Sequence, residues 1–175
     1  MKRPDILDNI SQEELQRLFD YDPETGVVTR KTAPSRRCKV GDVVGCRRPD
    51  GYLQVTISGT PHLLHRVIWR LATGDTPPEQ IEHVSHDKAD NRRENLRLAS
   101  HAENGRNQSM PSDNTSGYIG VYRHKSAQKW VACIRVGGRL HHLGLFADKT
   151  DAIAAREAAN LRFGFHPNHG HAVTA

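Results

Sequence analysis

The chain has 175 residues, 36% hydrophobic and 26% charged, with 25 basic and 20 acidic side chains and a formal net charge of +5. This length allows one or two small domains, each with a modest core, and the basic balance suits a polyanionic partner. No apolar run approaches membrane-spanning length, and the N-terminus lacks the apolar core of a signal peptide. We therefore expect an intracellular protein, neither secreted nor bound to a membrane.

The three cysteines are odd in number and form no C-x-x-C pair. A disulfide framework and a four-cysteine zinc site are therefore not expected. A zinc-stabilised structural module built from Cys38, Cys46 and histidines stays open as an alternative. It predicts tightly bound zinc in the purified protein.

The first 60 residues predict a short helix followed by antiparallel strands. Ser11 and Glu14 are spaced as a capping box, ahead of apolar residues that recur at helical spacing. The sequence that ends at Gly26 is typical of a turn. We expect strands at residues 27–29, 40–46 and 52–57.

Residues 30–39 are basic, include Arg36 and Arg37, and show no apolar periodicity. They are either a solvated loop or a contact for nucleic-acid phosphates, and the sequence leaves both open. Residues 62–71 then form a short amphipathic element, for which Gly74 is a suitable C-terminal stop.

The polar chemistry of the chain is concentrated in residues 81–107. A short strand, a polar loop and a second, alternating strand are followed by Ser100 and Glu103, which are spaced as a capping box that opens a helix. A strand–loop–strand–helix of this size can bring four polar side chains to one small site: Glu82, His83, Asn95 and Asn104.

These residue types suit the hydrolysis of a phosphodiester. A neutral imidazole near pH 7 can take the proton from an attacking water. A hard cation held by oxygen ligands neutralises the charge that develops on the phosphate.

The pattern acid-His, then Asn-Leu, then Glu-Asn resembles an HNH nuclease, the ββα-metal fold of phage and homing endonucleases. The resemblance implies that Glu82 and Asn104 hold one divalent metal ion, Mg²⁺ or Mn²⁺. It implies that His83 is the general base and that Asn95 orients its imidazole and pins the loop. The expected partner is double-stranded DNA, cut to leave 5′ phosphate and 3′ hydroxyl ends. The family usually has Asp where this chain has Glu82.

Residues 109–116 have linker composition, and a second module follows. We expect strands at residues 118–123, 129–136 and 139–144, with a two-glycine turn between the last two. A helix begins at residues 148–150, and Gly164 is a suitable stop. This plan is a three-stranded antiparallel sheet packed on one helix.

The residues of this module resemble the APETALA-type (ethylene-response-factor) DNA-binding domain, which reads the major groove from one sheet face. Period-two alternation places Trp130, Ala132, Ile134 and Val136 towards the helix, and Val131, Cys133 and Arg135 on the other face. Arg135 is the best expected base or phosphate contact, because arginine can pair two acceptors on guanine. The other expected contacts surround it: Tyr122, Arg123, Lys125, Arg139 and His142.

Together these features predict an α+β protein in which a ββα-metal HNH module with N-terminal antiparallel strands (residues 1–108) is joined by a linker (109–116) to a DNA-binding domain (117–170). The predicted function is metal-dependent DNA endonuclease, as a nick or a double-strand cut, in the cytoplasm of a bacterium or phage-infected cell, with a monomer favoured. The alternative is a DNA-binding protein whose nuclease site has degenerated, with Glu82 as the suspect.

Overall fold

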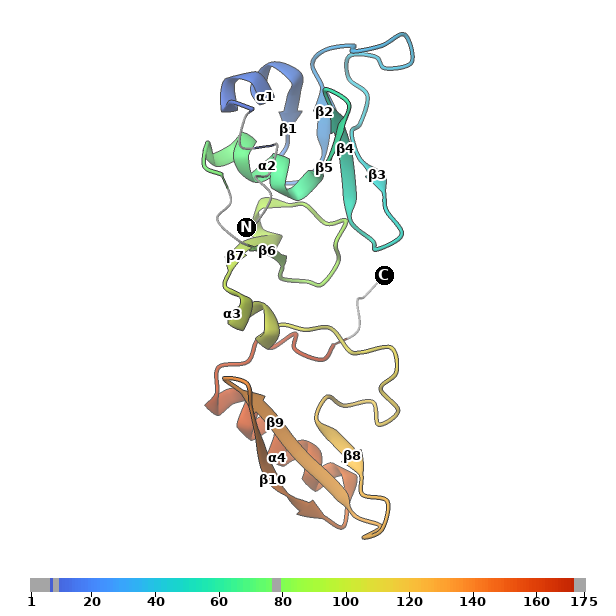
Figure 1. The fold of residues 1–175 in the computed structure, drawn as a ribbon, viewed down its shortest axis with the longest axis vertical. Coiled ribbons are helices and arrows are strands. Elements are labelled where there is room, and N and C mark those ends of the chain that lie inside the picture. The colour runs from blue at the N-terminus through green and yellow to red at the C-terminus, as the bar shows by residue number, and fades with distance from the viewer. Residues whose placement is uncertain (1–6, 8–9, 77–79, 172–175) are drawn as a thin grey trace. The chain divides into compact units, whose positions relative to one another are not determined.

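The computed structural model describes residues 7, 10–76 and 80–171 (Figure 1). The chain divides into two compact units, residues 1–99 and residues 100–174. Each unit combines helices with small antiparallel sheets, so the expected mixture of helices and strands is confirmed. The predicted domain limits at residues 108 and 117 stay predictions.

The first unit contains two helices, seven short strands and a 3₁₀ turn within its described residues. In chain order these are α1 (Gln12–Leu18), β1 (Phe19–Tyr21), β2 (Val28–Arg30), β3 (Cys46–Arg47), β4 (Leu53–Ile57), β5 (Thr60–Leu63), α2 (Leu64–Thr73), β6 (Gln80–His83), η2 (Arg93–Asn95) and β7 (Leu96–Ala99). The strands form two hairpins, β1–β2 and β6–β7, and a three-stranded sheet in the order β3-β4-β5.

The start of α1 and the end of α2 agree with the sequence prediction, whereas residues 62 and 63, expected in the amphipathic element, belong to β5. The Ser11 side chain accepts a hydrogen bond from the Glu14 backbone N–H at 3.1 Å, which satisfies one of the free donors at the start of α1. Gly74 ends α2 with φ of 80°, a left-handed conformation that glycine adopts without a steric cost.

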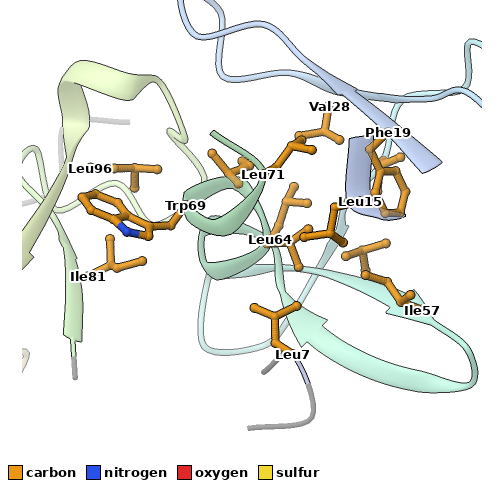
Figure 2. Close-up of a cluster of buried hydrophobic side chains, with 14 residues drawn as sticks. Leu7, Leu15, Phe19, Val28, Ile57, Leu64, Trp69, Leu71, Ile81 and Leu96 are labelled. Atoms are coloured by element: carbon orange, nitrogen blue, oxygen red, sulfur yellow. The ribbon is translucent and has the colours of Figure 1, made fainter. Parts of the chain in front are cut away.

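The core of the first unit is organised around α2, which has apolar side chains on two sides (Figure 2). Figure 2 shows Trp69 directed towards Ile81 and Leu96 of the β6–β7 hairpin. Leu64 lies on the side where α1 contributes Leu15, which is fully buried. One amphipathic helix therefore joins the hairpin to the N-terminal elements, because burying each side removes apolar surface from water.

The strand expected at residues 40–46 is wrong. Only Val43 makes a bridge, to Thr29, and the strand that pairs with β4 begins at Cys46. Gly41 and Gly45 have φ of 88° and 133°, which interrupt the extended backbone. Val43 is 71% exposed, so no burial holds it in a sheet.

The second unit contains α3 (His101–Arg106), β8 (Val121–Arg123), β9 (Trp130–Val136), β10 (Arg139–Phe146) and α4 (Lys149–Arg162). The predicted capping box at α3 is confirmed: the Ser100 hydroxyl accepts from Glu103 N–H, and the Glu103 carboxylate accepts from Ser100 N–H at 2.8 Å. The sheet has the order β10-β9-β8, with antiparallel pairing throughout.

One face of this sheet packs on α4 (Figure 1). Ala132 of β9 and Ala152 of α4 are fully buried together, with Trp130 against them, as the alternation predicts. The small alanine side chains let the helix lie close to the sheet. No helix in the described parts of either unit has the length and apolarity that crossing a membrane requires.

Candidate nuclease site

The β6–β7 hairpin presents three of the four predicted site residues, Glu82, His83 and Asn95, and its long loop is locally ordered. The second strand was expected from residue 94 and begins at Leu96, because residues 93–95 form the 3₁₀ turn η2. The Asn95 side chain accepts from Ser85 N–H at 2.8 Å and donates to the Asp90 carbonyl at 2.7 Å. The oxygen and the nitrogen of its one amide group therefore close the loop of residues 84–92 from inside.

The same loop is held from outside by the turn between β1 and β2. The Tyr21 hydroxyl donates to the Asn91 carbonyl at 2.9 Å. A Cβ atom on Gly26 would lie 2.6 Å from the backbone nitrogen of Arg92 and 2.7 Å from the carbonyl carbon of Asn91. The loop backbone therefore lies directly against this glycine. The turn at residues 21–26 thus supports the site.

His83 ends β6 and is buried, with 6% of its surface exposed. Its Nε2 lies 3.1 Å from Oδ1 of Asn91, which is also buried. An amide oxygen only accepts hydrogen bonds, so this contact places the proton of the neutral imidazole on Nε2 and leaves the lone pair on Nδ1. His65 packs edge-on at 5.1 Å between ring centroids, and Tyr52 lies at 5.7 Å.

Both histidines are held in the neutral form. Burial lowers the pKa of His83, while the Asn91 hydrogen bond and the carboxylates of Asp87 and Asp90 partly oppose that shift. Burial, with the neighbouring His83 and Arg66, lowers the pKa of His65 to about 3. The site therefore contains an unprotonated imidazole at neutral pH.

Glu82 precedes His83 on β6, and successive strand residues point to opposite faces. Its side chain is 3% exposed and pairs with Arg97, which lies directly opposite on β7. The Arg97 Nε donates to Oε1 of Glu82 at 2.6 Å, and Nη2 donates to the same oxygen. Oε2 is buried and has no hydrogen-bond donor among the described residues.

This carboxylate fits a divalent cation through one oxygen only. A buried carboxylate oxygen without a donor is the kind of ligand that a hard cation takes, while Arg97 holds the other oxygen. No group of three or more His, Cys, Asp or Glu side chains within residues 7, 10–76 and 80–171 is placed to hold a metal ion. Of the two predicted metal ligands, only Glu82 is one of these four residue types, because the other is an asparagine. Asn104 lies on α3, in the second unit, and its role as a ligand stays a prediction.

Residues 62–106, which include all four predicted site residues, match the HNH endonuclease family. This stretch is an HNH endonuclease domain. Protein 3.8 of Escherichia phage T7 is 32% identical over 79 residues, which cover 45% of this chain. The match spans 65% of the phage protein, less than two thirds of its length. No solved structure matches the chain.

Sequence reasoning assigned the HNH residues but missed three of their partners. Asn91, rather than Asn95, makes the hydrogen bond to His83. His65, on α2, packs edge-on against His83. Arg97 was detectable in principle, because pairing the two strands of the hairpin places it opposite Glu82.

The DNA contacts predicted on the strands of the C-terminal sheet divide between its two faces. Directly paired residues share a face, and Tyr122 pairs with Val131 while His142 pairs with Cys133. Tyr122 and His142 therefore share the face of Arg135, opposite α4. Arg123 and Arg139 pair instead with Trp130 and Val136, on the helix side.

The face opposite α4 is partly apolar. Tyr122, Leu140 and Leu145 are 48%, 59% and 49% exposed, and Arg135 is exposed among them. The remaining predicted contacts are exposed and lie outside strands and helices: Lys125, Arg36 and Arg37.

Proposed function

We propose that this protein is a metal-dependent DNA endonuclease in which His83 is the general base. The carrying observation is the His83 imidazole itself: it lies in an HNH endonuclease domain, is neutral at pH 7 and donates from Nε2 to Asn91. A general base must be unprotonated before it can act, and its free nitrogen must be presented consistently.

The residues around His83 support this chemistry. With the proton on Nε2, the Nδ1 lone pair takes the proton from water as the water attacks phosphorus. Asn91 holds the ring, and His65 and Tyr52 pack against it. Asn95 and Tyr21 hold the loop that carries Asn91. A fixed ring orientation favours attack, because less entropy is lost on reaching the transition state.

The metal ion would bind Glu82 through Oε2, with Asn104 as the second ligand that the sequence predicts. A bound Mg²⁺ or Mn²⁺ supplies charge neutralisation at the phosphate and at the departing 3′ oxygen. Burial of Glu82 keeps its carboxylate rotamer restricted, which favours one binding geometry.

The C-terminal unit would supply affinity for double-stranded DNA. Arg135, Tyr122 and His142 share one sheet face with exposed apolar side chains, which suit contact with thymine methyl groups. Five further basic side chains would contact DNA phosphates. Two lie on the helix side of the sheet, Arg123 and Arg139, and three lie in exposed loops, Lys125, Arg36 and Arg37. Linking two weak binding units in one chain raises their effective concentration on DNA.

A plasmid-nicking assay with Mg²⁺, Mn²⁺ or EDTA tests the proposal. Supercoiled DNA is expected to be cut by the wild type with metal and left intact with EDTA. His83→Gln should cut at least about 100-fold more slowly, because the general base is lost. His141→Ala, an exposed histidine on the helix side of the C-terminal sheet, is the matched control and should cut normally.

DNA binding measured in EDTA separates chemistry from folding. His83→Gln should bind duplex DNA as the wild type does. Loss of binding and cutting together would make His83 a structural residue, and unchanged cutting by His83→Gln would refute its role as the base.

A second candidate is a DNA-binding protein without cleavage, and the Arg97–Glu82 pair favours it. Arg97 already neutralises the carboxylate that the metal ion would need. This candidate predicts salt-sensitive DNA binding with no cutting in either metal. Arg97→Gln and Glu82→Asp then decide the cause: cutting switched on by either substitution would identify Glu82 as the silenced ligand.

A further inference from the structure

The second unit contains a pocket of about 450 Å³, within the size range of small-ligand sites. It is formed by α3, the β9–β10 turn, α4 and the segment after it. Three arginines line it: Arg106, Arg135 and Arg156. The other polar side chains of its described lining are Gln108 and His169, so no carboxylate faces these cations.

Arg156 is the fixed part of this pocket. It is 3% exposed, on α4, and Nη1 donates to the Cys133 carbonyl at 2.7 Å. Nε donates to Oδ1 of Asn160 at 2.9 Å, and Nη2 donates to Nε2 of His169 at 3.2 Å. The guanidinium also lies over the ring of Phe165. These partners hold the planar group in one orientation.

The backbone is shaped to admit this guanidinium. A Cβ atom on Gly120 would collide with Nη1 of Arg156 and with the Cys133 carbonyl oxygen. Gly120 has φ of 75°, so a glycine is needed there both for the turn and for the close approach. The position of the Arg156 side chain therefore depends on a glycine at residue 120.

Among the described residues, no carboxylate pairs with Arg156. Its described partners are a carbonyl, an amide, an imidazole and an aromatic ring, all neutral. A guanidinium keeps its proton even when buried, and a buried cation without an anion is unfavourable. An anion entering the pocket would relieve that cost.

The two other arginines, Arg106 and Arg135, line the same pocket and can contribute hydrogen-bond donors to such an anion. Arg135 donates through Nη1 to the Gly138 carbonyl at 3.0 Å, which holds it at the β9–β10 turn. The Arg106 side chain makes no hydrogen bond or ion pair within the described residues. Its donors are free to turn to a ligand.

We propose that this pocket binds a phosphate group, held by Arg156, Arg106 and Arg135. Arginine forks match the paired oxygens of a phosphate, and charge-assisted hydrogen bonds are stronger than neutral ones. The phosphate is either a backbone phosphodiester of DNA or a free phosphate group. The inference goes beyond cleavage and does not depend on it, because no residue of the pocket is a predicted general base or metal ligand.

Two titrations of the full chain test the site. In the first, inorganic phosphate is added at constant ionic strength and binding is followed by calorimetry. In the second, duplex DNA binding is measured in EDTA over a range of salt concentrations. The test variant is Arg106→Gln, whose side chain supports no described contact. Arg162→Gln, exposed on α4 and outside the pocket, is the matched control.

We expect Arg106→Gln to weaken phosphate binding about tenfold, and Arg162→Gln to leave it unchanged. If the natural ligand is a phosphodiester, Arg106→Gln also lowers the slope of log K against log salt by about 0.9. A weaker phosphate titration with an unchanged DNA slope identifies a free phosphate group.

The proposal is overturned if Arg106→Gln behaves like Arg162→Gln in both titrations. Arg156→Lys keeps the charge but loses the fork, and should weaken the same titration. If that variant fails to fold, Arg106→Gln alone decides. Failure of the nicking assay leaves this test intact, because neither titration measures cleavage.

Discussion

His83 of the HNH domain and Arg156 of the C-terminal unit are both buried, and burial lowers the pKa of each. The imidazole responds by losing its proton, because its ordinary pKa lies near 6.5. The guanidinium cannot do so and stays cationic. The same physical cost therefore leaves a neutral base in one unit and an unneutralised cation in the other.

This contrast explains what each unit is suited to do. A neutral imidazole with a free nitrogen can accept a proton from water. A fixed guanidinium beside two further arginines can hold an anion. The proposed general base and the proposed phosphate site therefore lie in different units, and a variant of either should leave the other working.

The largest expected effect is on cleavage. Replacing His83 by Ala should slow nicking by about 10²–10⁴-fold, the range that general-base catalysis contributes. Phosphate binding by the second unit should stay unchanged in the same calorimetric titration. If His83→Ala lost both nicking and phosphate binding, the two units would not act separately.

Stability should fall as the pH drops below about 6.5, because His65 and His83 are neutral in the folded state. The unfolded chain binds protons on these histidines below that pH, while the folded chain resists until the pH nears the lowered folded values, about 3 for His65. Each contributes up to about 1.4 kcal/mol per pH unit. Arg156 contributes nothing, since it is charged in both states.

Urea unfolding between pH 7.5 and 5 measures this slope. The chain has two tryptophans, so Trp130→Phe leaves Trp69 as the fluorescent reporter of the first unit. His65→Leu should reduce the slope. An unfolding free energy independent of pH over this range would contradict the neutral assignment of both histidines.

The next effect concerns Gly26, which lies against the loop that carries Asn91. Gly26→Ala should cost about 1–2 kcal/mol for its positive φ and about 1–3 kcal/mol more for the collision. Gly41→Ala is the matched control, because Gly41 also has positive φ but no atom within 4 Å of the added Cβ. Unfolding free energies and nicking rates compare them. Equal losses in the two variants would show that the loop of residues 84–92 moves away from the added Cβ atom without a measurable cost.

The smallest effect is expected from Tyr21→Phe, which removes one hydrogen bond to the Asn91 carbonyl. A loss of about 1 kcal/mol in unfolding free energy is expected, with a modest fall in nicking rate. Phosphate binding in the second unit should not change. A nicking loss as large as that of His83→Ala would mean that the loop, rather than the imidazole, limits cleavage.

Sequence reasoning identified the hairpin that carries most of the site and the serine caps that begin α1 and α3. Such features depend on residues a few positions apart, so local spacing reveals them. The strand expected at residues 40–46 was wrong because two glycines with positive φ interrupt an exposed segment. Alternation alone does not show whether burial will hold a strand.

The sequence by itself determined where α1 and α3 begin, which face of β9 meets α4, and which residues match an HNH nuclease. Only the tertiary structure decided the contacts that tune them. Tyr21 meets Asn91 across 70 positions, and Arg156 meets Cys133 across 23. Such contacts arise from packing of distant elements, and packing also sets the burial that neutralises His83 and leaves Arg156 charged.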